Sequence, residues 1–95
     1  MPVTLCVLLW AHPDRAEALT SYEDKVLALV AEHDGGVLQR GQVESGTPAE
    51  VQFLQFASQA ALDGYMNDPR RLAMAAERDA AVARTDVHPI RLFSS

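Results

Sequence analysis

The segment 3–11 has the alternation of a β-strand but is apolar on both faces. On one side of such a strand lie Val3, Leu5, Val7 and Leu9, and on the other lie Cys6, Leu8 and Trp10. A strand of this kind is stable only inside a sheet that is covered on both faces. The sequence therefore predicts a central strand, with one face covered by the chain itself and the other by a second layer.

An amphipathic helix is predicted after this strand. His12-Pro13-Asp14 interrupts the strand, and apolar positions then recur three or four residues apart, which indicates one helical face. These positions are Leu19, Tyr22, Val26, Leu29, Val30 and His33. They predict a helix of roughly twenty residues. We expect Gly35-Gly36 to end it, because a residue without Cβ readily adopts the left-handed conformation of a C-terminal cap.

Two further strands are predicted in the middle of the chain. Residues 37–44 carry Gln39, Arg40, Gln42 and Glu44, and this polar content is typical of a sheet edge. Ser45-Gly46-Thr47-Pro48 predicts a turn. Residues 50–57 are again apolar on both faces, with Val51 and Phe53 alternating with Leu54 and Phe56. This third strand therefore belongs beside the first.

The last third of the chain predicts an interrupted helix and a final strand. Ser58 is the expected N-cap, and the helix restarts with Asp68 as cap and Pro69 in its first turn. The alanines at 73, 76, 80 and 83 are spaced three or four residues apart, which predicts a slim face for close packing. Residues 86–93 form a strand that Pro89 restricts to an edge.

The order of these elements predicts a single α+β domain over residues 1–95 with a ferredoxin-like βαββαβ fold. Its four-stranded antiparallel sheet has two helices on one face. The other face would expose Cys6, Leu8, Trp10 and either Val51 and Phe53 or Leu54 and Phe56. Monomers tolerate only a few hundred Å² of contiguous apolar surface. We therefore expect a homodimer in which the partner covers this face.

Composition excludes several classes of partner. The net charge is −5, with 13 acidic against 8 basic residues, which argues against a nucleic-acid-binding surface. No apolar run approaches the ~20 residues that span a membrane, and the apolar start lacks the features of a signal peptide. We expect a cytoplasmic protein in which the lone Cys6 is a small apolar residue.

Several motifs carry a resemblance to a known superfamily. They are 22–30 followed by His-Asp-Gly-Gly-Val at 33–37, Arg40-Gly41, Phe-Leu-Gln-Phe-Ala-Ser-Gln-Ala-Ala at 53–61, and Tyr-Met-Asn-Asp-Pro at 65–69. With these motifs, nearly the whole chain resembles the dimeric α+β barrel superfamily, which includes antibiotic-biosynthesis-monooxygenase-like proteins and small polyketide cyclases. It looks most like a branch of unknown function. The resemblance implies a homodimer and a pocket more than a particular reaction.

The candidate site consists of four residues that could take part in chemistry and three aromatic residues that could contact a ligand. Tyr22, Tyr65, His12 and Arg40 could handle protons or stabilise charge. Trp10, Phe53 and Phe56 could contact a substrate. Each polar residue also has a structural interpretation. The tyrosines could anchor the core, and Arg40 could pair with a carboxylate at the dimer interface instead of one on a substrate.

No metal or organic cofactor is expected. The histidines at 12, 33 and 88 have no metal-like spacing, and no phosphate-binding glycine loop is present in the sequence. One hypothesis is a homodimeric, cofactor-independent enzyme that acts by acid–base catalysis on a small apolar or aromatic carbonyl compound. The alternative is a non-catalytic binding or dimerisation module. An open cavity between helices and sheet would favour the first, and a filled interior the second.

Overall fold

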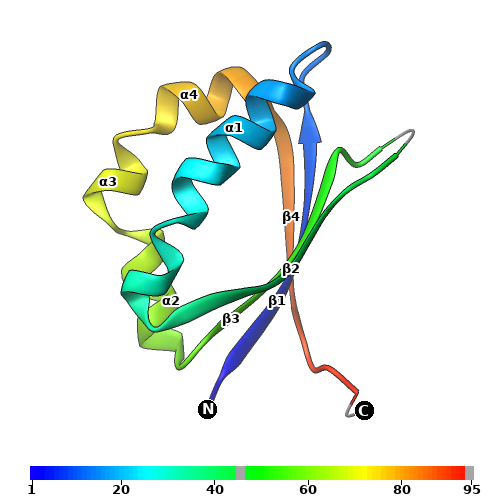
Figure 1. The fold of residues 1–95 in the computed structure, drawn as a ribbon. Helices are drawn as coiled ribbons and strands as arrows, with labels where there is room; N and C mark the ends of the chain where they lie inside the picture. Colours follow the sequence, from blue (N-terminus) through cyan, green and yellow to red (C-terminus); the bar gives the residue numbers. More distant parts are fainter. Residues whose placement is uncertain (45–46, 94–95) are drawn as a thin grey trace.

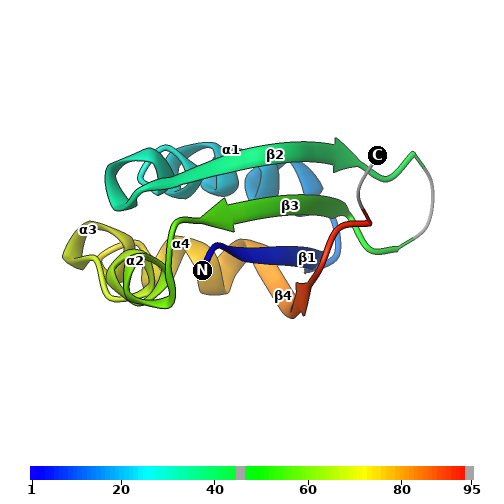
Figure 2. The same cartoon turned by 90° about the horizontal axis from the view of Figure 1, so that it is seen from below.

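The computed structural model describes residues 1–44 and 47–93, and Ser45 and Gly46 of the predicted turn lie outside this range. Four antiparallel strands form one sheet in the order β2-β3-β1-β4, and all the helices lie on one of its faces (Figures 1 and 2). The strands are β1 (Val3–Ala11), β2 (Gly35–Gln42), β3 (Glu50–Phe56) and β4 (Val82–Ile90). The helices are α1 (Ala16–Leu27), the 3-10 helix η1 (Val30–His33), α2 (Gln59–Met66), α3 (Pro69–Leu72) and α4 (Ala75–Ala81). This arrangement confirms the predicted ferredoxin-like fold.

The two strands that are apolar on both faces occupy the centre of the sheet, as the sequence predicts. In β1, Leu5, Val7 and Leu9 are buried against the helices, whereas Leu8 and Trp10 are half-buried on the opposite face. Strand β3 pairs with β1 in a register that places Leu5 opposite Leu54 and Cys6 opposite Phe53. Because residues directly opposite each other share a face, each central strand divides its apolar residues between the two faces.

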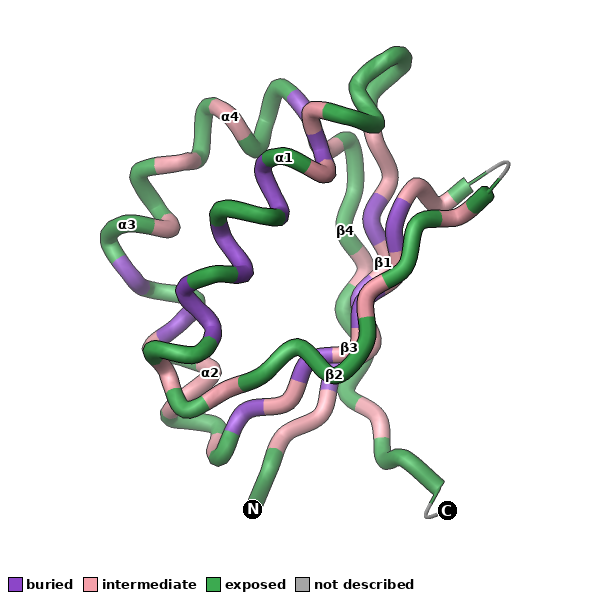
Figure 3. The backbone as a smooth tube through the Cα atoms, in the orientation of Figure 1, coloured by how far each residue is buried: buried purple, intermediate pink, exposed green. Residues whose placement is uncertain are grey.

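The core lies between α1 and the inner face of β1 and β3, where Figure 3 shows the buried residues gathered. Leu19 and Phe56 are completely buried there. Leu54 and Phe56 therefore belong to the helix-covered face. The outer face of β3 instead carries Val51 and Phe53, both half-buried.

The first helical region is shorter than predicted. Helix α1 ends at Leu27, and η1 follows it. The left-handed residue after η1 is Asp34, with φ 53°, so the predicted glycine cap is wrong. Gly35 is required for another reason: a Cβ there would lie 2.7 Å from Phe56 Cδ1 and 2.8 Å from Val30 Cγ1. Glycine thus allows β2 to begin directly against the core.

Both predicted N-caps of the second helical region are confirmed. The Ser58 hydroxyl accepts a hydrogen bond from the Ala61 N–H at 3.1 Å, and the Asp68 carboxylate accepts one from the Arg70 N–H at 2.8 Å. Pro69 occupies the first turn of α3, where its missing N–H leaves no helical hydrogen bond unmade. These caps divide the region into short helices that follow the surface of the core.

The predicted alanine face does not exist. The alanines at 73, 76, 80 and 83 are all exposed, and the last of them lies in β4. The helix breaks between α3 and α4. The four alanines therefore do not lie along one helix axis, and their spacing of three or four residues does not place them on a common face. Ala81 is buried instead, and Met74 packs against the core.

The last strand begins earlier than predicted. Strand β4 runs antiparallel to β1 from the pair Ala11 and Val82 to the pair Thr4 and Ile90. Its length thus matches that of β1, and Pro89 lies in this edge strand. Among the described residues, no helix is long and apolar enough to cross a membrane.

Candidate functional site

A cavity of about 320 Å³ lies on the inner face of the sheet, beneath the helices. Its walls are mainly aliphatic and aromatic, and they come from β1, β3, β4 and the helices. The polar residues in its lining are Tyr22, Glu23, Gln52, Tyr65, Arg71, Arg78 and Thr85. An apolar cavity with a few polar groups is the usual form of a small-molecule site.

Tyr22 and Tyr65 reach this cavity from α1 and α2. Both side chains are buried, and the Tyr65 ring packs against Phe56 with centroids 5.5 Å apart. Burial raises the pKa of Tyr22 and raises the pKa of Tyr65 to about 12. Both phenols therefore remain protonated at neutral pH, so they can donate hydrogen bonds to a ligand but are poor bases.

Glu23 and Gln52 form the buried polar part of the cavity lining. The Gln52 Nε2 donates to Glu23 Oε1 at 2.8 Å and to Glu50 Oε2 at 2.7 Å. Burial raises the pKa of Glu23, and the nearby Glu50 adds to this effect. A carboxyl group whose pKa is raised in this way can exchange a proton more readily near neutral pH.

Glu23, Glu50 and Gln52 are absent from the residues that the sequence singled out. A signal for two of them existed: Glu50 and Gln52 precede Leu54 and Phe56 at intervals of two residues, so all four lie on the inner face of the strand. Glu23 follows Tyr22 at the margin of the apolar helix face. A charged residue at such a margin is ordinarily solvated, and only tertiary packing shows that this one is buried.

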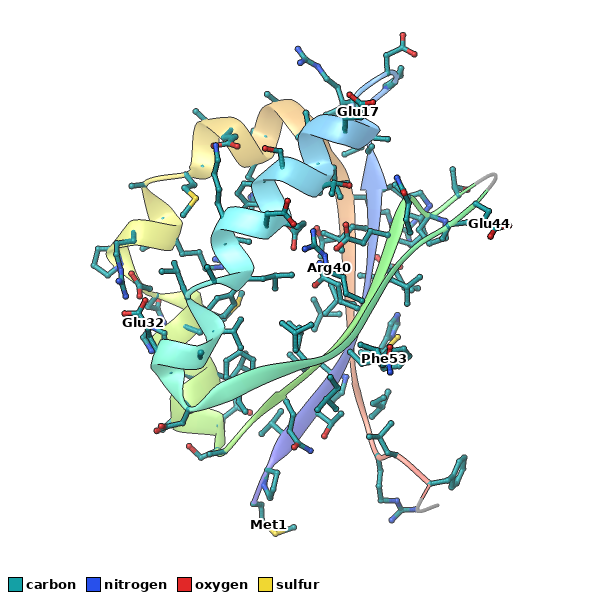
Figure 4. The ribbon with its side chains drawn as sticks, in the orientation of Figure 1. Met1, Glu17, Glu32, Arg40, Glu44 and Phe53 are labelled. Atoms are coloured by element: carbon teal, nitrogen blue, oxygen red, sulfur yellow. The ribbon has the colours of Figure 1, made fainter. Side chains whose placement is uncertain are left out.

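Arg40 lies outside the cavity lining, but it binds Glu50, which in turn accepts a hydrogen bond from Gln52 of the lining. Its Nε donates to Glu50 Oε2 at 2.6 Å, its Nη1 donates to Asp24, and its Nη2 donates to the Thr20 carbonyl at 3.2 Å. Figure 4 shows this side chain in the space between β2 and α1. Among the described residues, its anionic partners are thus the carboxylates of Asp24 and Glu50.

The remaining candidates are dispersed. His12 is exposed, with Nε2 at 3.1 Å from the Asp79 carbonyl oxygen, and it does not line the cavity. Trp10 and Phe53 lie on the outer face of the sheet, which Figure 4 shows for Phe53. The Arg84 guanidinium stacks 4.6 Å from the Trp10 ring centroid. The cavity therefore brings together Tyr22, Tyr65 and Phe56 from the sequence-based set.

His33, at the end of η1, contacts the residue that caps α3. His33 Nε2 lies 2.8 Å from Asp68 Oδ2, which ties η1 to the start of α3. Within residues 1–44 and 47–93, no group of three or more His, Cys, Asp and Glu side chains is placed to hold a metal ion.

Comparison with known proteins identifies the fold. No family model matches the sequence, and no curated protein matches it significantly. Solved structures do resemble it, among them a protein from Pseudomonas aeruginosa with TM-score 0.80 and 22% identity, covering 98% of this chain and 95% of that one. A candidate antibiotic biosynthesis monooxygenase from Bacteriodes thetaiotaomicron has TM-score 0.78 and 14% identity, covering 98% and 90%.

A third similar structure is a dimeric protein of unknown function with a ferredoxin-like fold from Bacteroides fragilis. It has TM-score 0.70 and 13% identity, and the match covers 96% of each chain. These neighbours share the ferredoxin-like fold that the sequence predicts. At such low identity they establish the shared fold and no particular activity.

Proposed function

We propose that this protein is a homodimer that binds a small apolar or aromatic carbonyl compound in the cavity between its helices and its sheet. The observation that supports this most directly is the open cavity of about 320 Å³, with apolar walls and a few polar groups. This volume is within the range of small-molecule sites. A module that merely dimerises would have this space filled by its own side chains.

The polar groups of the cavity suit cofactor-independent acid–base chemistry of the oxygenase, cyclase or isomerase type. Tyr22 and Tyr65 would donate hydrogen bonds to the carbonyl oxygen of the ligand, and Phe56 would contact its apolar part. Glu23 would exchange a proton with the ligand, because burial raises the pKa of this carboxyl group. Arg40 would be a positioning residue that acts through Glu50 and Gln52.

The outer face of the sheet supports the dimer in this proposal. It carries Cys6, Leu8, Trp10, Val51 and Phe53, which no helix of the described chain covers. A second copy that packs on this face would bury an apolar surface that a monomer would leave in water. The neighbour from Bacteroides fragilis, which has a ferredoxin-like fold, is described as dimeric, and this supports the proposal of a dimer.

A binding experiment with a neutral aromatic probe tests the cavity. We expect 2-naphthamide to bind the wild type in isothermal titration, and Leu62→Trp to weaken this binding at least about tenfold by placing an indole in the cavity. Leu72→Trp is the matched control, because Leu72 is exposed on α3 outside the cavity lining. Absence of binding, or equal binding to both variants, would contradict the proposal.

A further inference from the structure

Arg71 lines the cavity as a cation without a counter-ion. The guanidinium groups of Arg40, Arg70, Arg78 and Arg84 each form an ion pair with a carboxylate. Arg71 pairs with no carboxylate of the described residues, and its Nη1 donates only to the Met66 carbonyl oxygen, at 3.2 Å. An arginine so close to an apolar cavity ordinarily has an anionic partner.

The Nε and Nη2 atoms of Arg71 form one edge of its planar guanidinium group. Arg71 Nε is buried, and no residue within 1–44 and 47–93 accepts a hydrogen bond from it. The structure shows no hydrogen bond from Nη2 to a carboxylate or carbonyl group of the described residues, and the neighbour of the guanidinium is the neutral Tyr65 hydroxyl. The edge formed by Nε and Nη2 therefore has no anionic partner. This edge carries two parallel N–H groups, which match the two oxygens of a carboxylate.

The surroundings of Arg71 favour an anion attached to an apolar body. The guanidinium carbon lies 5.3 Å from the centroid of the Tyr65 ring, so the aromatic ring holds the cation from one side. The other cavity walls are mainly apolar, which would strengthen an ionic hydrogen bond formed beside them. The acidic residue of the lining, Glu23, forms no ion pair with Arg71, and its raised pKa makes it a weaker competitor for the cation.

We infer that the cavity binds small carboxylic acids with an apolar or aromatic body, and that the Nε and Nη2 edge of Arg71 receives the carboxylate. This inference rests on the proposed function and names the ligand class within it. The apolar walls would hold the body of the acid. Tyr22 and Tyr65 would remain free to donate to a carbonyl oxygen elsewhere on the ligand.

A pair of probes that differ in charge tests the inference. We expect 2-naphthoate to bind the wild type at least about tenfold more tightly than the neutral 2-naphthamide. Arg71→Met should remove most of this preference, with a loss of about tenfold or more for naphthoate and less than about threefold for naphthamide. Arg15→Met is the matched control, because it removes an arginine that is exposed and lies outside the cavity lining. It should change neither affinity by more than about threefold. Arg78→Met removes the other arginine of the lining, which pairs with Asp79.

Arg71→Lys provides a second variant if Arg71→Met proves unstable in thermal unfolding. Lysine keeps the charge but loses the planar edge, so we expect a selective loss of naphthoate affinity smaller than that of Arg71→Met. Equal affinities of the wild type for the two probes would overturn the inference and leave the apolar cavity as a binding site. A selective loss in Arg78→Met but not in the Arg71 variants would also overturn it. No binding of either probe at about 1 mM would overturn both proposals.

Discussion

At the scale of single residues, Glu23 is a carboxyl group held almost entirely away from water, with 5% of its surface exposed. Burial raises its pKa above the ordinary value of 4.5, so the folded protein binds this proton more tightly than the unfolded chain does. Its contribution to stability is therefore fully present below the unfolded pKa and is lost as pH rises through the folded pKa.

Glu23→Gln should for this reason be more stable than the wild type at neutral pH. Glutamine stays neutral and can still accept the hydrogen bond from Gln52. The difference should shrink as pH falls toward about 4, and urea unfolding from about pH 4 to about pH 8 measures it. Glu17→Gln, at an exposed position of the same helix, is the control and should leave the pH profile unchanged. A variant that is less stable than the wild type at neutral pH would refute this account of Glu23.

Arg40→Met should destabilise the protein, because it leaves the buried Glu50 without its cation. We expect a loss of about 2–3 kcal/mol in the free energy of unfolding, less than for a fully buried pair since Arg40 is partly exposed. Lys25→Met breaks the exposed Lys25–Glu77 pair and should cost less than about 1 kcal/mol. Similar losses in both variants, measured by urea unfolding, would mean that Glu50 does not depend on Arg40.

At the scale of elements, the junction between η1 and β2 depends on a close approach to the core. Gly35→Ala would place a methyl group against Phe56 and Val30, and overpacking of this kind costs about 1–3 kcal/mol. Gly36→Ala, one residue later, meets nothing within 4 Å and should be neutral or slightly stabilising. Thermal unfolding of the two variants separates steric contact from the general effect of replacing glycine. Equal destabilisation would contradict the steric explanation.

At the scale of the whole molecule, the outer face of the sheet should determine the oligomeric state. Analytical ultracentrifugation should give about twice the chain mass of 10.4 kDa. Trp10→Glu would place a charge in the middle of the proposed interface, where desolvation costs several kcal/mol, and should give a monomer that is destabilised or insoluble. Leu72→Glu adds the same charge to the helical layer and should remain dimeric. A well-folded monomeric wild type would refute the covering of this face by a second copy.

Much of the architecture followed from local patterns. Alternating apolar residues identified β1 and β3 as central strands, and Ser58 and Asp68 marked helix starts, because strand alternation and N-caps depend on residues close together in the chain. The helix break before α4 escaped the same reasoning. Met74 packs against the core at this break, and alanine spacing carries no information about such a contact.

The sequence by itself determined which residues are apolar, where the two central strands and the second helical region begin and, through strand alternation, which residues share a sheet face. Tertiary structure decided which polar groups meet. Glu23, Gln52 and Arg71 come from three distant elements, and their common position on one cavity depends on helix packing and strand register. The register of β2 and β3 also places Arg40 opposite Gln52, two residues from Glu50. In this position, the Arg40 guanidinium donates a hydrogen bond to the Glu50 carboxylate. Such contacts depend on long-range geometry, which periodicity along the chain does not encode.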